Sequence, residues 1–273
     1  MRNIMIMTLS TLREAMSKKV FLFFMGISAV VLIIQLVIFS LVSTDRLIKA
    51  VNPMGLKIPM LQIVSSFELM IVSPLAALGL LLAIFSSSSF IPTMLEKGNI
   101  DLLLSKPVSR TELISGKYLG GLLVVFINVF FLVFGVWLII SMKFGFWNPV
   151  FLSISLVITF TFAVLYSMIV LFGIITQGSV FGMMMAYFTF LILSPLLYIA
   201  KEKVLVAIEN GILKNIIRVC YYIVPKTSEL MGSFLTNITA GKEIESFQPV
   251  FTSLVFLILM LLLSIIIFRK KDF

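Results

Sequence analysis

The sequence has no histidine and a single cysteine, Cys220, among its 273 residues. These absences exclude catalysis by a histidine general base, metal sites built from histidine and cysteine, and disulfide bonds within the chain. Charged residues are also scarce, at 12% of the chain, whereas soluble domains carry about 25%. The composition therefore excludes a soluble globular domain.

Hydrophobic residues are abundant instead, at 60% of the chain, and the mean hydropathy is +1.18. Lys and Arg exceed Asp and Glu to give a net charge of +9. This excess lies in loops and at the chain ends, and it does not form the basic stripe that binds a phosphate backbone. The lipid bilayer is the expected partner, and nucleic acid is not.

Six windows are apolar enough to cross a hydrocarbon core, which requires roughly 20 helical residues. They are residues 20–42, 63–85, 118–142, 150–175, 180–200 and 250–268. Because lipid offers backbone groups no hydrogen-bond partners, runs of this length are predicted to be helices. The expected fold class is an all-α integral membrane protein, with six transmembrane helices in a single transmembrane domain, residues 1–273.

An even number of spans puts both termini on one side of the membrane. Lys and Arg are divided almost equally between the two sides, with a higher density on the side of the termini, which weakly favours a cytoplasmic location for that side. The first apolar run is too long for the core of a signal peptide and is interpreted as an uncleaved span.

Two segments outside the spans also have a helical pattern. Residues 1–19 are predicted to form an amphipathic helix at the membrane interface, with an ordinary charged lead-in as the alternative. The apolar positions of this helix are Met5, Leu9, Leu12 and Met16. Residues 201–249 are predicted to form an ordered extracytoplasmic loop, in which apolar residues at helical spacing from Val204 to Ile216 indicate a helix.

The polar segment between the second and third spans, residues 91–117, is the most informative part of the chain. Ser109 and Glu112 have the spacing of a capping box, which predicts a helix that begins near Arg110 and runs straight into the third span. Gly116 and Gly120 would let another helix approach closely. Residues 96–105 are predicted to form a short helix beside the membrane.

This segment resembles the loop between spans two and three in the membrane subunits of ABC-2 type ABC transporters, particularly the branch that includes NosY of nitrous-oxide reductase maturation. The family pattern is Glu, two residues, Gly-Thr, then Leu-Leu-Ser-x-Pro-x-Ser-Arg, then Gly-Lys. The matching residues are Glu96, Gly98, Leu103, Leu104, Ser105, Pro107, Ser109, Arg110, Gly116 and Lys117. The chain departs from the pattern in two ways: Asn99 stands where Thr is common, and one residue, not two, separates Glu96 from Gly98.

The resemblance implies that this loop is a coupling helix that docks on a cytoplasmic ABC ATPase. Glu96 and Arg110 would be the charged contacts, and Pro107 and Ser109 would shape the loop. It also implies two cytoplasmic termini in the cell membrane of a prokaryote. The expected activity is export of a substrate, or transmission of force to an accessory protein on the outer side.

The chain has no Gly-x-x-x-x-Gly-Lys-Ser/Thr loop to cradle nucleotide phosphates. We therefore expect no cofactor or catalytic residue in this chain, with ATP and Mg bound by the partner ATPase. Two-fold symmetry of an ATPase pair predicts a second permease half, in the simplest case another copy of this chain.

Glu68 is the only acidic or basic residue inside a predicted span, so a role in the transport pathway or in gating is one hypothesis. Hydrogen bonding or snorkelling near the outer surface is the other. At the level of the whole protein, the competing interpretation is a nonenzymatic membrane scaffold or channel without an ATPase. An intramembrane enzyme ranks last, because the spans hold no pair of acidic residues and no histidine.

Overall fold

The computed structural model describes residues 2–17, 19–52, 58–96, 98–99, 108–201, 211–243 and 246–271. These residues form helices and turns, with no strand among them. The elements are α1 (Arg2–Ser17), α2 (Lys19–Leu41), α3 (Thr44–Val51), α4 (Met60–Ser87), α5 (Phe90–Leu95), α7 (Arg110–Phe144), η1 (Pro149–Ser153), α8 (Ile154–Thr176), α9 (Ser179–Phe188), η2 (Thr189–Leu193), α10 (Ser194–Ile199), α12 (Gly211–Ile223), α13 (Thr227–Glu229), η4 (Leu230–Phe234), α14 (Leu235–Thr239) and α15 (Gln248–Lys270).

Six helical stretches of the described chain are long and apolar enough to cross a membrane. They are α2, α4 continued by α5, α7, η1 continued by α8, α9 continued through η2 and α10, and α15. Four of the six predicted windows fall within one of these stretches, and the windows 20–42 and 180–200 each extend one residue past the end of theirs. The predicted fold class, an all-helical protein with six candidate spans, is therefore confirmed.

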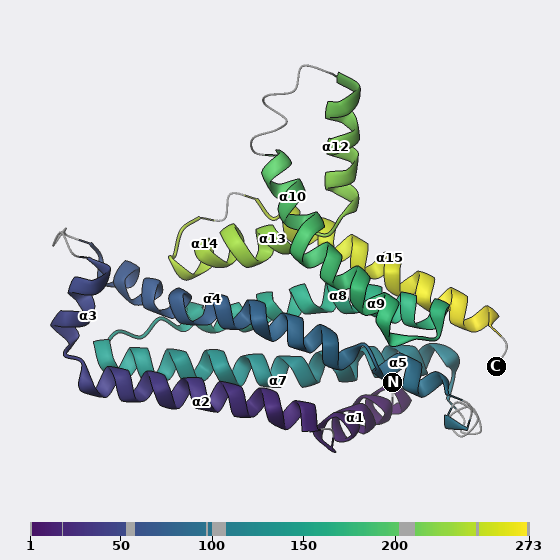
Figure 1. Ribbon diagram of the computed structural model, residues 1–273, viewed down its shortest axis with the longest axis horizontal. Helices are drawn as coiled ribbons and strands as arrows, with labels where there is room; N and C mark the ends of the chain where they lie inside the picture. Colours follow the sequence, from purple (N-terminus) through teal and green to yellow (C-terminus); the bar gives the residue numbers. More distant parts are fainter. Residues whose placement is uncertain are drawn as a thin grey trace.

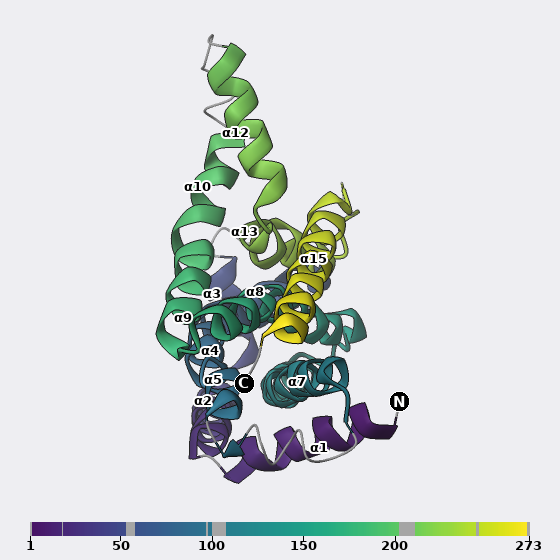
Figure 2. The ribbon, with the colours of Figure 1, turned by 90° about the vertical axis from the view of Figure 1, so that its right-hand side faces the viewer.

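The central helix of the bundle is α8, whose side chains are mostly buried. It is surrounded by α7, α9, α15 and α4, while α2 and α4 pack on α7 from two sides (Figures 1 and 2). Few side chains of α2 and α15 are buried. A buried central helix with exposed, apolar helices around it is the arrangement expected of a bundle that faces lipid.

Backbone geometry accounts for the turns and irregularities of the middle spans. Gln177, with a φ of 54°, ends α8 in the left-handed conformation, and α9 begins two residues later, so the two helices are joined by a tight turn. The fifth span contains the π-helical turn η2, which ends at Leu193, two residues before Pro195. Proline has no N–H for a hydrogen bond to the preceding turn, and a widened turn accommodates this loss within one continuous helix.

One end of the bundle gathers segments that are distant in the sequence. In Figure 1, α1, α5, the start of α7 and the last turn of α15 lie at this end, which we call the terminal end. Figure 2 views the molecule from this end. The two ends of the chain thus lie at the same end of the bundle, as an even number of spans requires. The helix α3 and the start of α4 lie at the opposite end.

The segment between the fifth and sixth spans contains α12, α13, η4 and α14, and it encloses a polar cluster. The Tyr221 hydroxyl donates a hydrogen bond to Glu229, while Lys201 Nζ donates to Tyr221 at 2.8 Å. Lys226 Nζ lies 3.2 Å from the centroid of the Tyr221 ring. Burial lowers the pKa of Lys226 to about 8, and burial together with Glu229 raises the pKa of Tyr221.

Candidate functional site

A reciprocal capping box starts α7, as the sequence predicts. The Ser109 hydroxyl accepts a hydrogen bond from the Glu112 backbone N–H at 3.2 Å, and the Glu112 carboxylate accepts one from the Ser109 N–H at 2.9 Å. The carboxylate also lies in the first turn, where the helix dipole favours negative charge. From this cap α7 continues to Phe144 as a single helix. Residues 110–117, the last part of the predicted loop, are therefore continuous with the third span.

The N-terminal helix α1 packs on the first turns of α7 at two glycines. A methyl group built on Gly116 would overlap Cβ of Met7, and one built on Gly120 would overlap Cβ of Thr11. The glycines are four residues apart, as are Met7 and Thr11, so both contacts fall on one face of each helix. The expected close approach of another helix at Gly116 and Gly120 is confirmed, and the approaching helix is α1.

Lys117 joins the same contact through charge. Its ammonium group lies 2.6 Å from the Glu14 carboxylate, and the exposed fractions of the two side chains are 9% and 32%. At this burial the pair is better shielded from water and salt than an ordinary surface ion pair. The pair therefore fixes the position of α1 on α7.

Arg110, the first residue of α7, binds the end of the last helix. Its guanidinium Nη1 donates hydrogen bonds to the carbonyl oxygens of Phe268, Arg269 and Lys271, at 3.0, 3.2 and 2.6 Å. These carbonyls belong to the last turn of α15 and the residue after it, where the final carbonyls of a helix have no partner within the helix. Arg110 thereby caps α15.

Lys271 extends this network to the central helix. Its ammonium group donates hydrogen bonds to the carbonyl oxygens of Ile174 and Ile175 at 2.8 and 3.3 Å. These two carbonyls lie in the last turn of α8, where a cation interacts favourably with the helix dipole. At the terminal end, α7, α15 and α8 are therefore connected by two cationic side chains.

The structure locates only part of the predicted loop. Glu96 and Gly98 are exposed, and Gly98 has a φ of +94°, a left-handed conformation that suits glycine. The side-chain amide of Asn99 donates a hydrogen bond to the Thr93 carbonyl at 3.0 Å. Leu103, Leu104 and Pro107, and most of the predicted helix over residues 96–105, lie outside the described residues.

The beginning of the loop differs from the sequence-based boundary at residue 91. The helix α5 spans Phe90–Leu95, and its apolar side chains are buried, with Ile91 packed near Gly173 of α8. The apolar composition of this short segment explains why it packs into the bundle. The polar loop accordingly begins at Glu96, the residue that caps α5.

Glu68 lies inside the bundle. Its exposed fraction is 0%, and it lies in the first half of α4, which begins at the end of the bundle opposite to the terminal end. Neither carboxyl oxygen has a hydrogen-bond partner among the described residues. A carboxyl group in this position is costly to maintain.

Three residues of the terminal-end network were not identified from the sequence. Glu14, Met7 and Thr11 are not part of the apolar stripe predicted for residues 1–19. That stripe includes Met5 and Leu9, which are exposed. The matching four-residue spacing of Met7 and Thr11 with Gly116 and Gly120 is the one signal that could have suggested the pairing.

Six helices that are long and apolar enough to cross a membrane define a multi-pass membrane protein. The sequence profile of a family described as ABC-2 family transporter protein matches residues 9–273, nearly the whole chain. The chain therefore belongs to the ABC-2 family, and it is a transmembrane permease of the ABC transporter class. No curated protein matches the chain.

Proposed function

We propose that the chain is the membrane subunit of an ATP-driven exporter or force transmitter, in which the loop from Glu96 to Lys117 receives movement from a separate cytoplasmic ABC ATPase. The observation that carries the proposal is the attachment of this loop to α7 through the Ser109 capping box, with Arg110 and Lys117 bound to other helices.

The terminal-end network gives the proposed coupling a physical route. Displacement of the loop moves the start of α7, and Arg110 and Lys117 carry α15 and α1 with it. Since α7 runs as one helix to Phe144, whose ring stacks on Phe67 at 5.3 Å, the displacement reaches the opposite end of the bundle. Phe67 precedes Glu68, so we propose that this buried carboxyl group takes part in the pathway or in gating.

The remaining parts of the proposal follow from the loop motif and the family. Glu96 and Gly98, with Leu103, Leu104 and Pro107, form the surface offered to the ATPase. ATP and Mg bind that partner, and the transport unit contains two permease halves, which we take to be copies of this chain. In this proposal the termini are cytoplasmic in the cell membrane of a prokaryote, and the resemblance of the loop motif supports membership of the NosY-like branch.

The test is association with the ABC ATPase that copurifies with the chain from native membranes. Glu96→Lys reverses the charge of the exposed residue at the start of the loop. We expect this variant to lose most of its binding to the ATPase and its stimulation of ATP hydrolysis. Arg110→Glu should weaken both readouts as well, and the double variant should abolish them.

Glu243→Lys is the matched control, because it makes the same change at an exposed residue between the fifth and sixth spans. It should bind and stimulate the ATPase as the wild type does. Unchanged binding by the Glu96→Lys, Arg110→Glu double variant would refute the assigned contacts. A functional assembly that purifies without any nucleotide-binding subunit would favour a scaffold or channel instead.

A further inference from the structure

Glu68 lies on the face of α4 that is directed into the bundle. Val64 and Val72, which precede and follow it by four residues and share its face, are fully buried, as Glu68 is. Met70, on another side of the same helix, is 74% exposed. The helices that pack on α4 include α7 and the central helix α8. The carboxyl group is therefore directed at the core of the bundle and not at the surrounding lipid.

Glu68 forms no ion pair among the residues that the structure describes. It is the only charged residue of α4, and η1, α8, α9 and α14 contain none. The charged residues of the neighbouring elements at this end of the bundle are exposed or partly exposed: Asp45, Arg46 and Lys49 of α3, Lys143 of α7, and Lys242 and Glu243 after α14. The tyrosines of α8 and α9 lie toward the terminal end. Tyr166 stacks on Tyr118, and Tyr187 donates a hydrogen bond to the Leu81 carbonyl.

An ionised carboxylate is strongly disfavoured in such surroundings. Moving a charge out of water is costly even after the protein relaxes, unless a counter-ion or hydrogen bonds compensate. Neither oxygen of Glu68 has a hydrogen-bond partner among the described residues. A carboxyl group in this position avoids the cost by binding a proton, because the neutral acid needs far less solvation. The structure, which encloses Glu68 completely, therefore favours the neutral carboxylic acid.

Two short elements, η1 and α14, close the end of the bundle beside Glu68. Glu68 lies eight residues after the start of α4, about 12 Å at 1.5 Å per residue. Nδ2 of Asn148, which precedes η1, donates a hydrogen bond to the Thr239 carbonyl of α14 at 3.4 Å. A Cβ built on Gly241, just after α14, would lie 3.2 Å from Leu61 of α4. The hydrogen bond is long and therefore weak, so η1 and α14 can separate at small cost.

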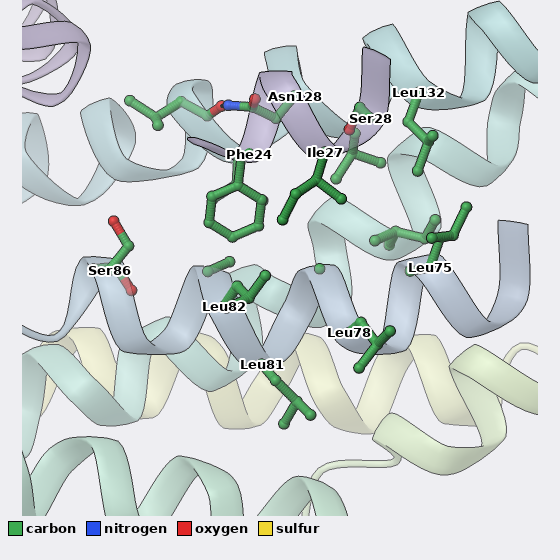
Figure 3. Close-up of a pocket in the computed structure, with 18 of the residues that line it drawn as sticks. Phe24, Ile27, Ser28, Leu75, Leu78, Leu81, Leu82, Ser86, Asn128 and Leu132 are labelled. Atoms are coloured by element: carbon green, nitrogen blue, oxygen red, sulfur yellow. The ribbon is translucent and has the colours of Figure 1, made fainter. Parts of the chain in front are cut away.

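The apolar cavity between α2 and α4 gives water no second route to Glu68. Its volume is about 350 Å³, and the residues that α4 contributes to its lining run from Leu75 to Ser87 (Figure 3). Leu75 is seven residues, about 10 Å, from Glu68 along α4 toward the terminal end. The lining is mostly apolar, and apolar cavities stay dry. Water therefore reaches Glu68 through the end of the bundle where η1 and α14 meet.

We propose that Glu68 is a proton-binding site, which holds a proton while η1 and α14 are in contact and releases it to the outer side when they separate. On release the O–H bond of the carboxylic acid breaks, its electron pair stays on the carboxylate, and the proton passes to water. The charge left behind needs water, so it favours the separated arrangement. By reciprocity, binding of a proton favours closure. This inference deepens the gating role of Glu68 and rests on the proposed function for that role, whereas the proton site itself requires no ATPase.

The first measurement is the infrared spectrum of the full chain in maltoside micelles, which contain no carbonyl group. The carbonyl stretch of a protonated carboxylic acid is separate from the bands of a carboxylate. At about pH 7, subtraction of the Glu68→Gln spectrum from that of the wild type should leave one carboxylic acid band. Glu243→Gln is the matched control, because an exposed glutamate is ionised at this pH. Subtraction of its spectrum should leave no such band.

The second measurement follows the separation of η1 and α14 with pH. Thr239→Cys, in a Cys220→Ser background, places a thiol at a fully buried position of the closure, and its rate of labelling by a maleimide reports opening. Between about pH 5 and about pH 9, which covers the titration of exposed and buried carboxyl groups, the rate should rise about tenfold more with Glu68 than with Glu68→Gln. The comparison cancels the pH dependence of the thiol itself. Glu68→Asp, which keeps a titrating carboxyl group, should retain the rise.

Two results would overturn the proposal. A wild-type spectrum without a carboxylic acid band that depends on Glu68 would show that the group is ionised while the bundle is closed. The same dependence of labelling on pH with Glu68 and with Glu68→Gln would show that its proton does not control the closure. Neither measurement involves an ATPase. Either failure therefore leaves the loop from Glu96 to Lys117 to its own binding test, and a failed binding test leaves the proton site standing.

Discussion

Single residues decide how closely α1 and α7 approach, and Gly116 is the clearest case. Gly116→Leu would place a side chain where Cβ of Met7 now lies, with the Ile4 carbonyl oxygen 3.2 Å from the new Cβ. Because backbone atoms cannot yield as a flexible side chain does, α1 must move away from α7. We expect the free energy of unfolding in mixed micelles to fall by about 1–3 kcal/mol. The control is Gly26→Leu, which should change it by less than about 0.5 kcal/mol.

The ion pair of Lys117 and Glu14 should behave as a coupled unit. Lys117→Met should lower the free energy of unfolding by about 1–2 kcal/mol, because it leaves a partly buried carboxylate without its partner. Glu14→Gln should also destabilise the chain. In a double-mutant cycle, the combined variant should cost about 1 kcal/mol less than the sum of the single changes. Strict additivity would mean that the two groups do not interact in solution.

Lys226 predicts a dependence of stability on pH in the segment between the fifth and sixth spans. Its pKa is lowered from 10.5 to about 8 in the folded protein, so between these values the unfolded chain binds a proton that the folded protein does not. Stability should therefore rise with pH over this window. Above about pH 10, ionisation of tyrosine in the unfolded chain opposes the rise, since the folded pKa of Tyr221 is raised.

The measurement is the free energy of unfolding between about pH 8 and pH 10, where we expect a gain of about 2 kcal/mol in the wild type. Lys226→Met removes the titrating group, so the free energy of unfolding of this variant should not change with pH over the same window. An equal rise in both proteins would assign the effect to another group.

At the scale of elements, the ends of α15 and α8 depend on two side chains from elsewhere in the chain. Arg110→Ala removes the donor to three carbonyls at the end of α15. Amide hydrogen exchange in the last turn of α15 should become about tenfold faster, which corresponds to about 1.4 kcal/mol. The matched control is Arg269→Ala, an exposed cation in the same turn, which should leave exchange near the wild-type rate.

Local sequence predicts some features of the helices and not others. The start of α7 could be predicted because Ser109 and Glu112 satisfy each other within three residues. The burial of α5 could not, because its six residues are too few to show a period, and their neighbour is α8, about eighty residues away in the chain. For the same reason the capping of α15 by Arg110 left no pattern in the sequence.

At the scale of the whole molecule, the bundle predicts which residues share a side of the membrane. Thr111 lies at the terminal end and Arg218 lies in α12, and both are exposed. In a Cys220→Ser background, we expect a membrane-impermeant maleimide to label Arg218→Cys in intact cells and Thr111→Cys only after permeabilisation. Labelling of Thr111→Cys in intact cells would contradict the proposed orientation and would place the terminal end outside the cell.

The sequence alone determined the number, type and approximate limits of the spans. This was possible because each apolar run must satisfy its own backbone hydrogen bonds in lipid, a local requirement that composition and length reveal. The family followed from the loop motif together with this plan. Both conclusions rest on residues that are close together in the chain.

Only the tertiary structure decided which helices meet and what each charged residue binds. The contact of Glu14 with Lys117 and the burial of Glu68 both depend on helices from distant parts of the chain. In a bundle whose helices are apolar on every side, hydropathy does not distinguish the face that packs from the face that meets lipid. Close packing at small residues and the pairing of a few polar groups make that choice.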